Sequence, residues 1–377
     1  VAVTYENGTA VPVPELITDT KGYAVSPELP YGSYVVVEST TPENLKTIDP
    51  FVVNVEDDNR EPMQWRVFDD RPFVFLLKIV KKDAQTGNTV LKAGASYKIY
   101  DVTNKKYVEQ VVQYPKKEKI SVFETNEEGY LITPQELKCS TYRIEEVKAP
   151  EGFVRQGSEE SLYDGTMIIS PLEQTTKGTY KENPQSGIVI TVSSNTAHQI
   201  DPDTGAAIVE VEQKNDEQVG SLLLTKKGEQ LTEVTGDSVL EKVKTLVSKV
   251  KNAVSGKEET GIYKDFKYEE TGVEGAQFEV YAKDTIYSPD GAKDEEGNPV
   301  VRYEKDDLVA KLTTDENGTA VIYNLPLGTY YLKEVVAGEN FVLNTEQKEF
   351  TLTAEDDTQA VVYEGVTYKN ERQKISI

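Results

Sequence analysis

The segment LPLGTYYLKE, residues 325–334, decides the fold because the chain carries its pattern twice more. The related segments are LPYGSYVVVE at residues 29–38 and LKCSTYRIEE at residues 137–146. Each begins with Leu, has Tyr at its sixth position and ends on a Glu nine residues after the Leu. Self-similarity of this kind indicates repeated structural units, so we expect three related domains.

A turn signal precedes each copy of the pattern. The sequences TDTKG (18–22), TNEEG (125–129) and TDENG (314–318) combine Asp or Asn with a final Gly, which is typical of tight hairpin turns. Two further segments, GASYKIY at 94–100 and GAQFEVY at 275–281, alternate large apolar and polar residues as strands do. These features predict an all-β protein of tandem Ig-like β-sandwich domains.

Further strands are expected where short apolar runs lie between Gly, Pro, Asn and Asp residues. These runs are residues 34–38, 51–55, 188–192, 208–211, 309–313, 330–335, 350–352 and 361–363.

The repeat predicts domain boundaries near residues 72 and 217. Domain one, 1–72, is expected to be partial and to lack its first strand. Domain two, 73–217, has an insertion before its last strand, and domain three, 218–377, has a helical insertion at about 232–256. The junctions have no Gly/Ser-rich or Pro-rich linker, which favours a stiff rod.

The expected helix covers about residues 239–254. An apolar stripe recurs at helical spacing from Val239 to Val250, and Ser238 with Glu241 forms a capping box. We expect the helix to pack on the flank of its domain, and a partner-binding helix is the alternative.

Composition excludes several classes of function. The net charge of −24 disfavours nucleic acid and anionic membranes as partners. The single Cys rules out an internal disulfide, and the single His leaves little material for metal or imidazole chemistry, so we expect no cofactor and no metal. No apolar run is long enough to span a membrane, and the chain begins mid-pattern, so we expect a fragment of a longer protein.

Three motifs carry a resemblance to a known family. KKDAQTG at 81–87 is similar to the K-x-D-x-x-T-G opening of collagen-adhesin B-type (Cna-B) repeats. YRIEEVKAPEGF at 142–153 resembles the E-box of sortase-assembled pilins of Gram-positive bacteria, and YKNE at 368–371 resembles the strand that carries the family's asparagine.

The resemblance implies a covalent Lys–Asn isopeptide bond that forms without an external enzyme and is promoted by a buried Glu. Carried over by position, the implied sets are Lys81, Glu146 and Asn215 in domain two, and Lys226, Glu334 and Asn370 in domain three. Domain one has Glu38 and Asp70 without a lysine strand, so we expect no bond there. Strand alternation alone leaves Lys82 and Lys227 open as alternatives to Lys81 and Lys226.

The chemistry of such a site is physically reasonable. Burial disfavours the ammonium form of lysine, and only the neutral amine is a nucleophile. A neutral Glu in the same core can hydrogen-bond and polarise the Asn carbonyl, and proximity replaces an activated intermediate. The product would tie the first strand to the last, which suits a surface protein without disulfides.

Weaker motifs have simpler interpretations. YPKK at 114–117 resembles the pilin motif that sortase joins to the next subunit, but a solvated loop is the expected reading. The pairs Asp201/Asp203 and Asp290/Asp294 could hold calcium, but they lack the spacing of an EF-hand, so we expect solvated turns.

These features favour a structural stalk or pilin-type protein on the cell wall of a Gram-positive bacterium, with no enzymatic activity beyond its own crosslinking. Its partners would be neighbouring domains or subunits. The alternative is an adhesin module that binds a host protein or glycan through its insertions.

Overall fold

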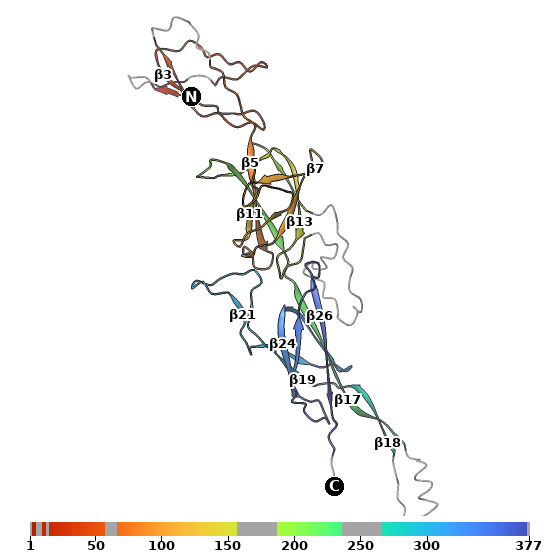
Figure 1. The fold of residues 1–377 in the computed structure, drawn as a ribbon. Helices are drawn as coiled ribbons and strands as arrows, with labels where there is room; N and C mark the ends of the chain where they lie inside the picture. Colours follow the sequence, from red (N-terminus) through yellow and green to blue (C-terminus); the bar gives the residue numbers. More distant parts are fainter. Residues whose placement is uncertain are drawn as a thin grey trace, which may run out of the picture.

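The computed structural model describes residues 2–4, 10–12, 15–56, 66–156, 187–235 and 265–374. Within these ranges all helical or extended secondary structure is β-strand. The molecule is elongated, with β3 (Gly32–Val36) near one end and β18 (Asp265–Gly272) near the other (Figure 1).

The middle unit consists of two sheets that share one hydrophobic core. The first sheet has the order β10–β6–β13–β14 with β7 beside β6, and the second has the order β11–β5–β16–β15 with β12 beside β5. The strands of the first sheet are β6 (Ser96–Asp101), β7 (Lys106–Tyr107), β10 (Phe123–Glu124), β13 (Ser140–Lys148) and β14 (Ile188–Val192). Those of the second are β5 (Val74–Asp83), β11 (Tyr130–Ile132), β12 (Leu137–Lys138), β15 (Gln199–Ile200) and β16 (Ala207–Asn215). A separate hairpin joins β8 (Gln110–Val112) to β9 (Glu118–Ile120).

The C-terminal unit repeats this plan. One sheet has the order β18–β17–β23 with β26 also paired to β17, and the other has the order β22–β19–β24–β25. Its strands are β17 (Val219–Thr235), β19 (Gln277–Ala282), β22 (Leu308–Thr313), β23 (Thr319–Pro326), β24 (Gly328–Val336), β25 (Lys348–Leu352) and β26 (Val361–Asn370), together with β18. A small hairpin, β20 (Ile286–Tyr287) with β21 (Val301–Tyr303), follows β19.

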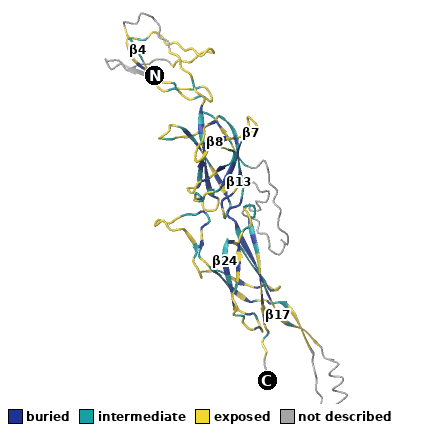
Figure 2. Cartoon of the chain, in the orientation of Figure 1, coloured by how far each residue is buried: buried dark blue, intermediate teal, exposed yellow. Residues whose placement is uncertain are grey.

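Alternation along the strands builds the two cores. On β5 the residues Phe75, Leu77 and Ile79 are fully buried, and the residues between them are partly exposed. The middle core contains residues from Phe73 to Val209, and the C-terminal core is a separate cluster from Leu222 to Tyr368. Figure 2 shows the buried residues concentrated in these two units. Each unit is thus a two-sheet sandwich, which confirms the predicted all-β, Ig-like fold.

The N-terminal segment is more open. Its described strands form two ribbons, β1 (Ala2–Thr4) with β2 (Ala10–Pro12), and β3 with β4 (Phe51–Val55). Tyr34 is buried, but Val35 and Val52, which face each other across β3 and β4, are both more than half exposed.

The tyrosine of the sequence repeat has the same role in all three copies. The hydroxyls of Tyr34, Tyr142 and Tyr330 each donate to the carbonyl four residues earlier, at 2.6, 2.7 and 2.6 Å respectively. This contact resembles the tyrosine corner of Ig-like sandwiches and fixes the chain as it enters the strand.

Most predicted strands lie where the structure has strands, and residues 51–55 and 188–192 match in full. The predicted helix at 239–254 lies outside the described residues. The insertion was expected to begin at about residue 232; residues 232–235 belong to β17, and residues 233–235 pair with the start of β18. Cross-strand pairing therefore extends the sheet into the first residues of the expected insertion, with a register shift between Leu231 and Glu233.

The hairpin of β20 and β21 braces the junction between the middle and C-terminal units. The fully buried Asp290, in the loop after β20, accepts hydrogen bonds from Asn88 Nδ2 at 3.0 Å and Thr86 Oγ1 at 3.3 Å. Arg302 on β21 donates to both carboxylate oxygens of Glu217. This junction is a packed polar interface rather than a flexible tether.

Candidate functional site

In both units the first and last strands lie side by side and run parallel. On β5, Lys81 lies opposite Gln213 of β16, so Asn215 is two residues further along on the same face. On β17, Lys226 lies opposite Tyr368 of β26, and Asn370 is again two residues further along. The offset is identical in the two units, and it brings each lysine and asparagine to one end of the core.

The repeated hairpin turn holds the backbone of each lysine. Lys81 N–H donates to the carbonyl of Gly129 at 2.8 Å, and Lys226 N–H donates to the carbonyl of Gly318 at 2.6 Å. Both glycines have positive φ, and a Cβ on either would lie within 2.4 Å of a backbone carbonyl oxygen. The oxygen belongs to Val90 in the middle unit and to Lys226 in the C-terminal unit, and only glycine allows these close approaches.

Glu146 lies at the centre of the site in the middle unit. Its Oε1 is 2.7 Å from Lys81 Nζ, and its Oε2 accepts from Asn215 Nδ2 at 2.8 Å. The backbone N–H of Gln156 donates to the same Oε2 at 2.7 Å, and the hydroxyl of Tyr97 donates to Oε1 at 3.4 Å. The side chains of Lys81 and Glu146 have no exposed surface.

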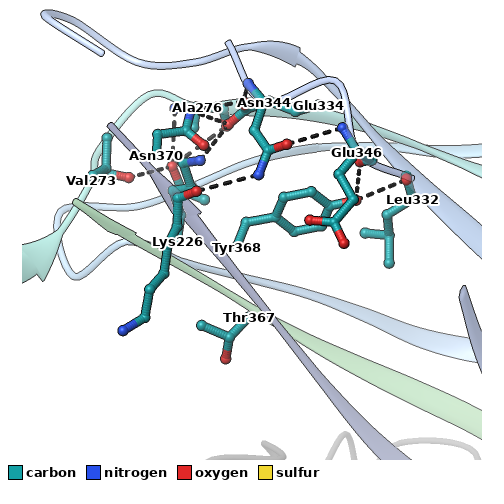
Figure 3. Close-up of polar contacts among 12 residues, drawn as sticks. Lys226, Val273, Ala276, Leu332, Glu334, Asn344, Glu346, Thr367, Tyr368 and Asn370 are labelled. Atoms are coloured by element: carbon teal, nitrogen blue, oxygen red, sulfur yellow. Dashed lines mark hydrogen bonds and ion pairs between the residues drawn. The ribbon is translucent and has the colours of Figure 1, made fainter. Parts of the chain in front are cut away.

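Glu334 has the equivalent position in the C-terminal unit (Figure 3). Its Oε1 is 2.6 Å from Lys226 Nζ, and Asn370 Nδ2 lies 3.0 Å from Oε1 and 2.7 Å from Oε2. The backbone N–H of Asn344 donates to Oε2 at 2.7 Å. Both charged side chains are again without exposed surface.

Burial changes the ionisation of the two lysines. It lowers the pKa of Lys81 and of Lys226, and the attraction of the neighbouring carboxylate opposes this shift only in part. Aromatic rings add to the low-polarity surroundings, with Lys81 Nζ 5.9 Å from the centre of the Tyr97 ring and Lys226 Nζ 5.8 Å from that of Phe278. A neutral, nucleophilic amine is therefore easier to reach here than in water.

The asparagine amides each leave one buried atom without a partner. Oδ1 of Asn215 and Oδ1 of Asn370 are buried and accept no hydrogen bond. A half-turn of either amide would bring this oxygen to the neighbouring carboxyl group. That contact is a hydrogen bond only when the glutamate carries a proton.

The neighbouring lysines have other partners. Lys82 Nζ donates to Thr89 Oγ1 at 3.0 Å, and the half-exposed Lys227 lies 3.9 Å from Glu270. Strand alternation thus directs Lys81 and Lys226, rather than these two, into the cores.

The N-terminal segment has only part of the arrangement. Oε2 of Glu38 accepts the backbone N–H of Ile48 at 2.9 Å, but Glu38 is only half-buried. Within the described residues no ion pair joins it to a lysine and no hydrogen bond joins it to Asp70.

The sequence did not reveal every group around the two glutamates. The N–H of Gln156 and the N–H of Asn344 both lie ten residues after their glutamate, as does that of Ile48 after Glu38. Backbone donors have no residue signature, so no motif could have identified them. Tyr97 was noted only for its strand periodicity, and its hydroxyl bond could not be foreseen.

The remaining candidate residues have structural surroundings. Oδ1 of Asp201 and Oδ1 of Asp294 accept backbone N–H groups of their own turns, whereas Asp290 bridges the two units. Across the described ranges no group of acidic, His or Cys side chains is arranged to hold a metal ion. In the same ranges no helix is long and apolar enough to cross a membrane.

Comparison with known proteins identifies related folds. The family model described as SpaA, prealbumin-like fold domain, matches residues 1–67, 76–162 and 259–367. No curated protein matches the chain. Similar solved structures include the Bacillus anthracis TIE protein, at 18% identity and a TM-score of 0.39 over 98% of this chain and 46% of that one. This chain thus spans about half the length of that protein.

Two pilins are also similar. A streptococcal ancillary pilin has 18% identity and a TM-score of 0.24, covering 92% of this chain and 76% of its own. GBS52, the minor pilin of Streptococcus agalactiae, has 17% identity and a TM-score of 0.24, covering 80% of this chain and 98% of its own.

Proposed function

The chain belongs to the family of SpaA prealbumin-like fold domains, and from this premise we propose that it is a structural segment of a Gram-positive surface stalk or pilus. In this proposal two intramolecular isopeptide bonds, Lys81–Asn215 and Lys226–Asn370, stabilise it. Glu146 and Glu334 promote their formation. The segment would lie outside the cell, joined to the cell wall through the rest of the protein.

The observation that carries the proposal is the enclosed Lys–Glu–Asn set, present twice. A buried ion pair is costly and is weak evidence for stability by itself. A buried ion pair beside an asparagine amide, at the same offset in two units, is better explained as a set of reactants.

The proposed reaction needs no reagent from outside. Proton transfer from the lysine to the glutamate gives a neutral amine and a neutral carboxyl group. The amine nitrogen attacks Cγ of the asparagine, the new C–N bond forms, and the bond from Cγ to Nδ2 breaks. The glutamate moves one proton from the attacking nitrogen to the leaving nitrogen, so that ammonia leaves and the glutamate is unchanged.

Each bond would close a long loop between the first and last strands of a unit. In the chain-entropy description, a link that closes a loop of roughly one hundred residues stabilises a fold by about 4.7 kcal/mol. A reducing environment would not break it. Because the linked strands are adjacent and parallel, pulling force would pass through the bond rather than unzip the sheet.

We also propose that the domains divide near residues 72 and 217. The two separate cores support the second division, and the polar junction of Asp290 and Arg302 supports a stiff connection across it. A stiff connection suits a stalk that holds another part of the protein away from the cell.

A second candidate function is adhesion through the insertion in the C-terminal unit. The ribbon of β17 and β18 bears Leu231, Val234, Phe266 and Tyr268, all substantially exposed. The pairs Leu231–Tyr268 and Val234–Phe266 lie directly opposite each other, so the four share one face. Adhesion is favoured if replacing Val234 and Phe266 with Ser abolishes retention on host matrix while both crosslinks still form.

Intact mass tests the main proposal. The purified chain should be lighter than its sequence mass by two ammonias, and Glu146→Ala and Glu334→Ala should each restore one. Glu38→Ala is the matched control, because Glu38 holds the same repeat position without a lysine, and it should leave both losses unchanged. An unmodified wild-type mass would refute the crosslinks.

A further inference from the structure

One difference between the two sites is the aromatic residue opposite the glutamate, and another is Gln213 of β16 at the position where β26 has Tyr368. Tyr97 on β6 and Phe278 on β19 occupy the same place, each after a Gly-Ala pair and each beside the reactive lysine. Both are fully buried. Only Tyr97 has a hydroxyl, and that hydroxyl donates to Glu146 Oε1. The C-terminal unit does have Tyr368 nearby, but its hydroxyl bonds the carbonyls of Leu332 and Glu346 instead (Figure 3).

The carboxyl groups are oriented differently in the two sites. Beside Tyr97, Oε1 of Glu146 accepts from the lysine and Oε2 accepts from the asparagine, so that each oxygen faces one reactant. Beside Phe278, Asn370 Nδ2 bridges both oxygens of Glu334. The amine of Lys226 is close to Oε1 but lacks the geometry of a hydrogen bond.

We propose that Tyr97 is a positioning residue that holds Oε1 of Glu146 toward Lys81 and leaves Oε2 to Asn215 and the backbone N–H of Gln156. The inference rests on the proposed crosslinking reaction and deepens it. An acid proton on Oε2, the oxygen that faces Asn215, can polarise the asparagine carbonyl. Oε1 is then free to take the proton that the amine loses, and the proton on Oε2 passes to the leaving nitrogen as ammonia departs.

The tyrosine can act as a donor throughout the useful pH range. Burial, followed by the nearby charge of Glu146, raises the pKa of Tyr97 far above its ordinary value. Its hydroxyl therefore keeps its proton. It can donate that proton to Oε1 of Glu146 regardless of which carboxyl oxygen carries the acid proton.

The test measures the rate of each crosslink in one molecule. Chain purified in denaturant before it has folded is diluted into native buffer, quenched in acid at intervals and digested, and the two crosslinked peptides are quantified. We expect Tyr97→Phe to slow the Lys81–Asn215 bond about fivefold to tenfold, the effect of losing one hydrogen bond of about 1 kcal/mol or slightly more. The Lys226–Asn370 bond is the internal reference and should keep its rate.

A matched variant separates positioning from stability. Tyr142→Phe also removes a buried tyrosine hydroxyl from the middle unit, but that hydroxyl bonds the carbonyl of Lys138 and not Glu146. We expect it to leave the crosslinking rate within about twofold of wild type. The reciprocal Phe278→Tyr should speed the C-terminal bond, and the pH profile of the middle bond in Tyr97→Phe should approach that of the C-terminal bond.

The outcomes are distinguishable. A wild-type chain that loses no ammonia overturns both the crosslinks and the role of Tyr97. A wild-type chain that forms both bonds, with Tyr97→Phe reacting at the wild-type rate and profile, overturns the role of Tyr97 alone. Equal slowing by Tyr97→Phe and Tyr142→Phe also overturns it, because a general loss of packing would then be the cause.

Discussion

Glu38, Glu146 and Glu334 hold the same position of the repeat, but their surroundings differ. Each accepts a backbone N–H ten residues later, and each follows a tyrosine whose hydroxyl caps the chain four residues earlier. Only Glu146 and Glu334 are enclosed with a lysine and an asparagine. The repeat therefore builds a carboxylate acceptor by local means, and a strand that is distant in sequence turns the acceptor into a candidate reactive site.

Replacing the glutamate should give the largest difference in the free energy of unfolding between the enclosed sites and the site of Glu38. Glu334→Ala is expected to lower the free energy of unfolding of its unit by at least roughly 5 kcal/mol, because the crosslink is lost and Lys226 is left buried without a partner. Glu38→Ala removes one half-buried acceptor and should cost about 1 kcal/mol. Denaturant unfolding followed by tyrosine fluorescence measures both, and equal losses would contradict the distinction between the sites.

The glycines of the repeated hairpin turn allow a second comparison between the C-terminal unit and the N-terminal segment. Gly318→Ala should cost roughly 3 kcal/mol, because the new methyl group meets the carbonyl of Lys226 and φ is positive. Gly22 has the same turn position and a positive φ but open space around it, so Gly22→Ala should cost only about 1 kcal/mol. Thermal unfolding of the two variants tests the difference. A similar decrease in the melting temperature of both variants would mean that the turn does not hold the lysine strand.

The ion pair of Arg302 and Glu217, at the junction of the middle and C-terminal units, can be compared with an exposed ion pair inside the C-terminal unit. Arg302→Ala leaves the buried Glu217 unpaired, and we expect a loss of about 2 kcal/mol together with faster hydrogen exchange at the amides of Arg155 and Gln218. Lys283→Ala, which breaks the exposed pair with Glu349 in the same unit, should change stability by less than about 0.5 kcal/mol. Unchanged exchange in Arg302→Ala would show that this pair does not brace the junction.

The last comparison concerns the pH dependence of stability and sets a free lysine against a crosslinked one. In Asn370→Ala, Lys226 keeps its amine, and burial lowers its folded pKa below the ordinary 10.5. Between those two values the unfolded chain binds more protons, so the free energy of unfolding should rise with pH, by at most about 1.4 kcal/mol per pH unit. Below the folded pKa both states carry the proton, so this group contributes no further change.

A wild-type chain crosslinked as proposed would have no titrating amine at this position and should lack that rise. Unfolding free energies of the two chains, measured in parallel from neutral pH to about pH 10, give the difference. If the difference between the two unfolding free energies did not change with pH, Lys226 would not be buried as a free amine in Asn370→Ala.

The sequence alone determined the local elements, because side-chain alternation, turn glycines and the Leu-to-Glu spacing are properties of neighbouring residues. They led directly to Glu146 and Glu334 and to strands such as β4 and β14. The choice of Lys81 over Lys82 came from family spacing, since alternation by itself could not set the phase of the strand.

Only the tertiary structure decided what surrounds the glutamates. Lys81 and Asn215 lie 65 residues before and 69 residues after Glu146, and the parallel register of β5 and β16 that brings them together depends on how two sheets pack. The hydroxyl of Tyr97 and the backbone donors at Gln156 and Asn344 depend on the same packing. The orientation and protonation of a carboxyl group in a closed core depend on every polar group within hydrogen-bonding distance. Those groups come from segments that only the fold brings together.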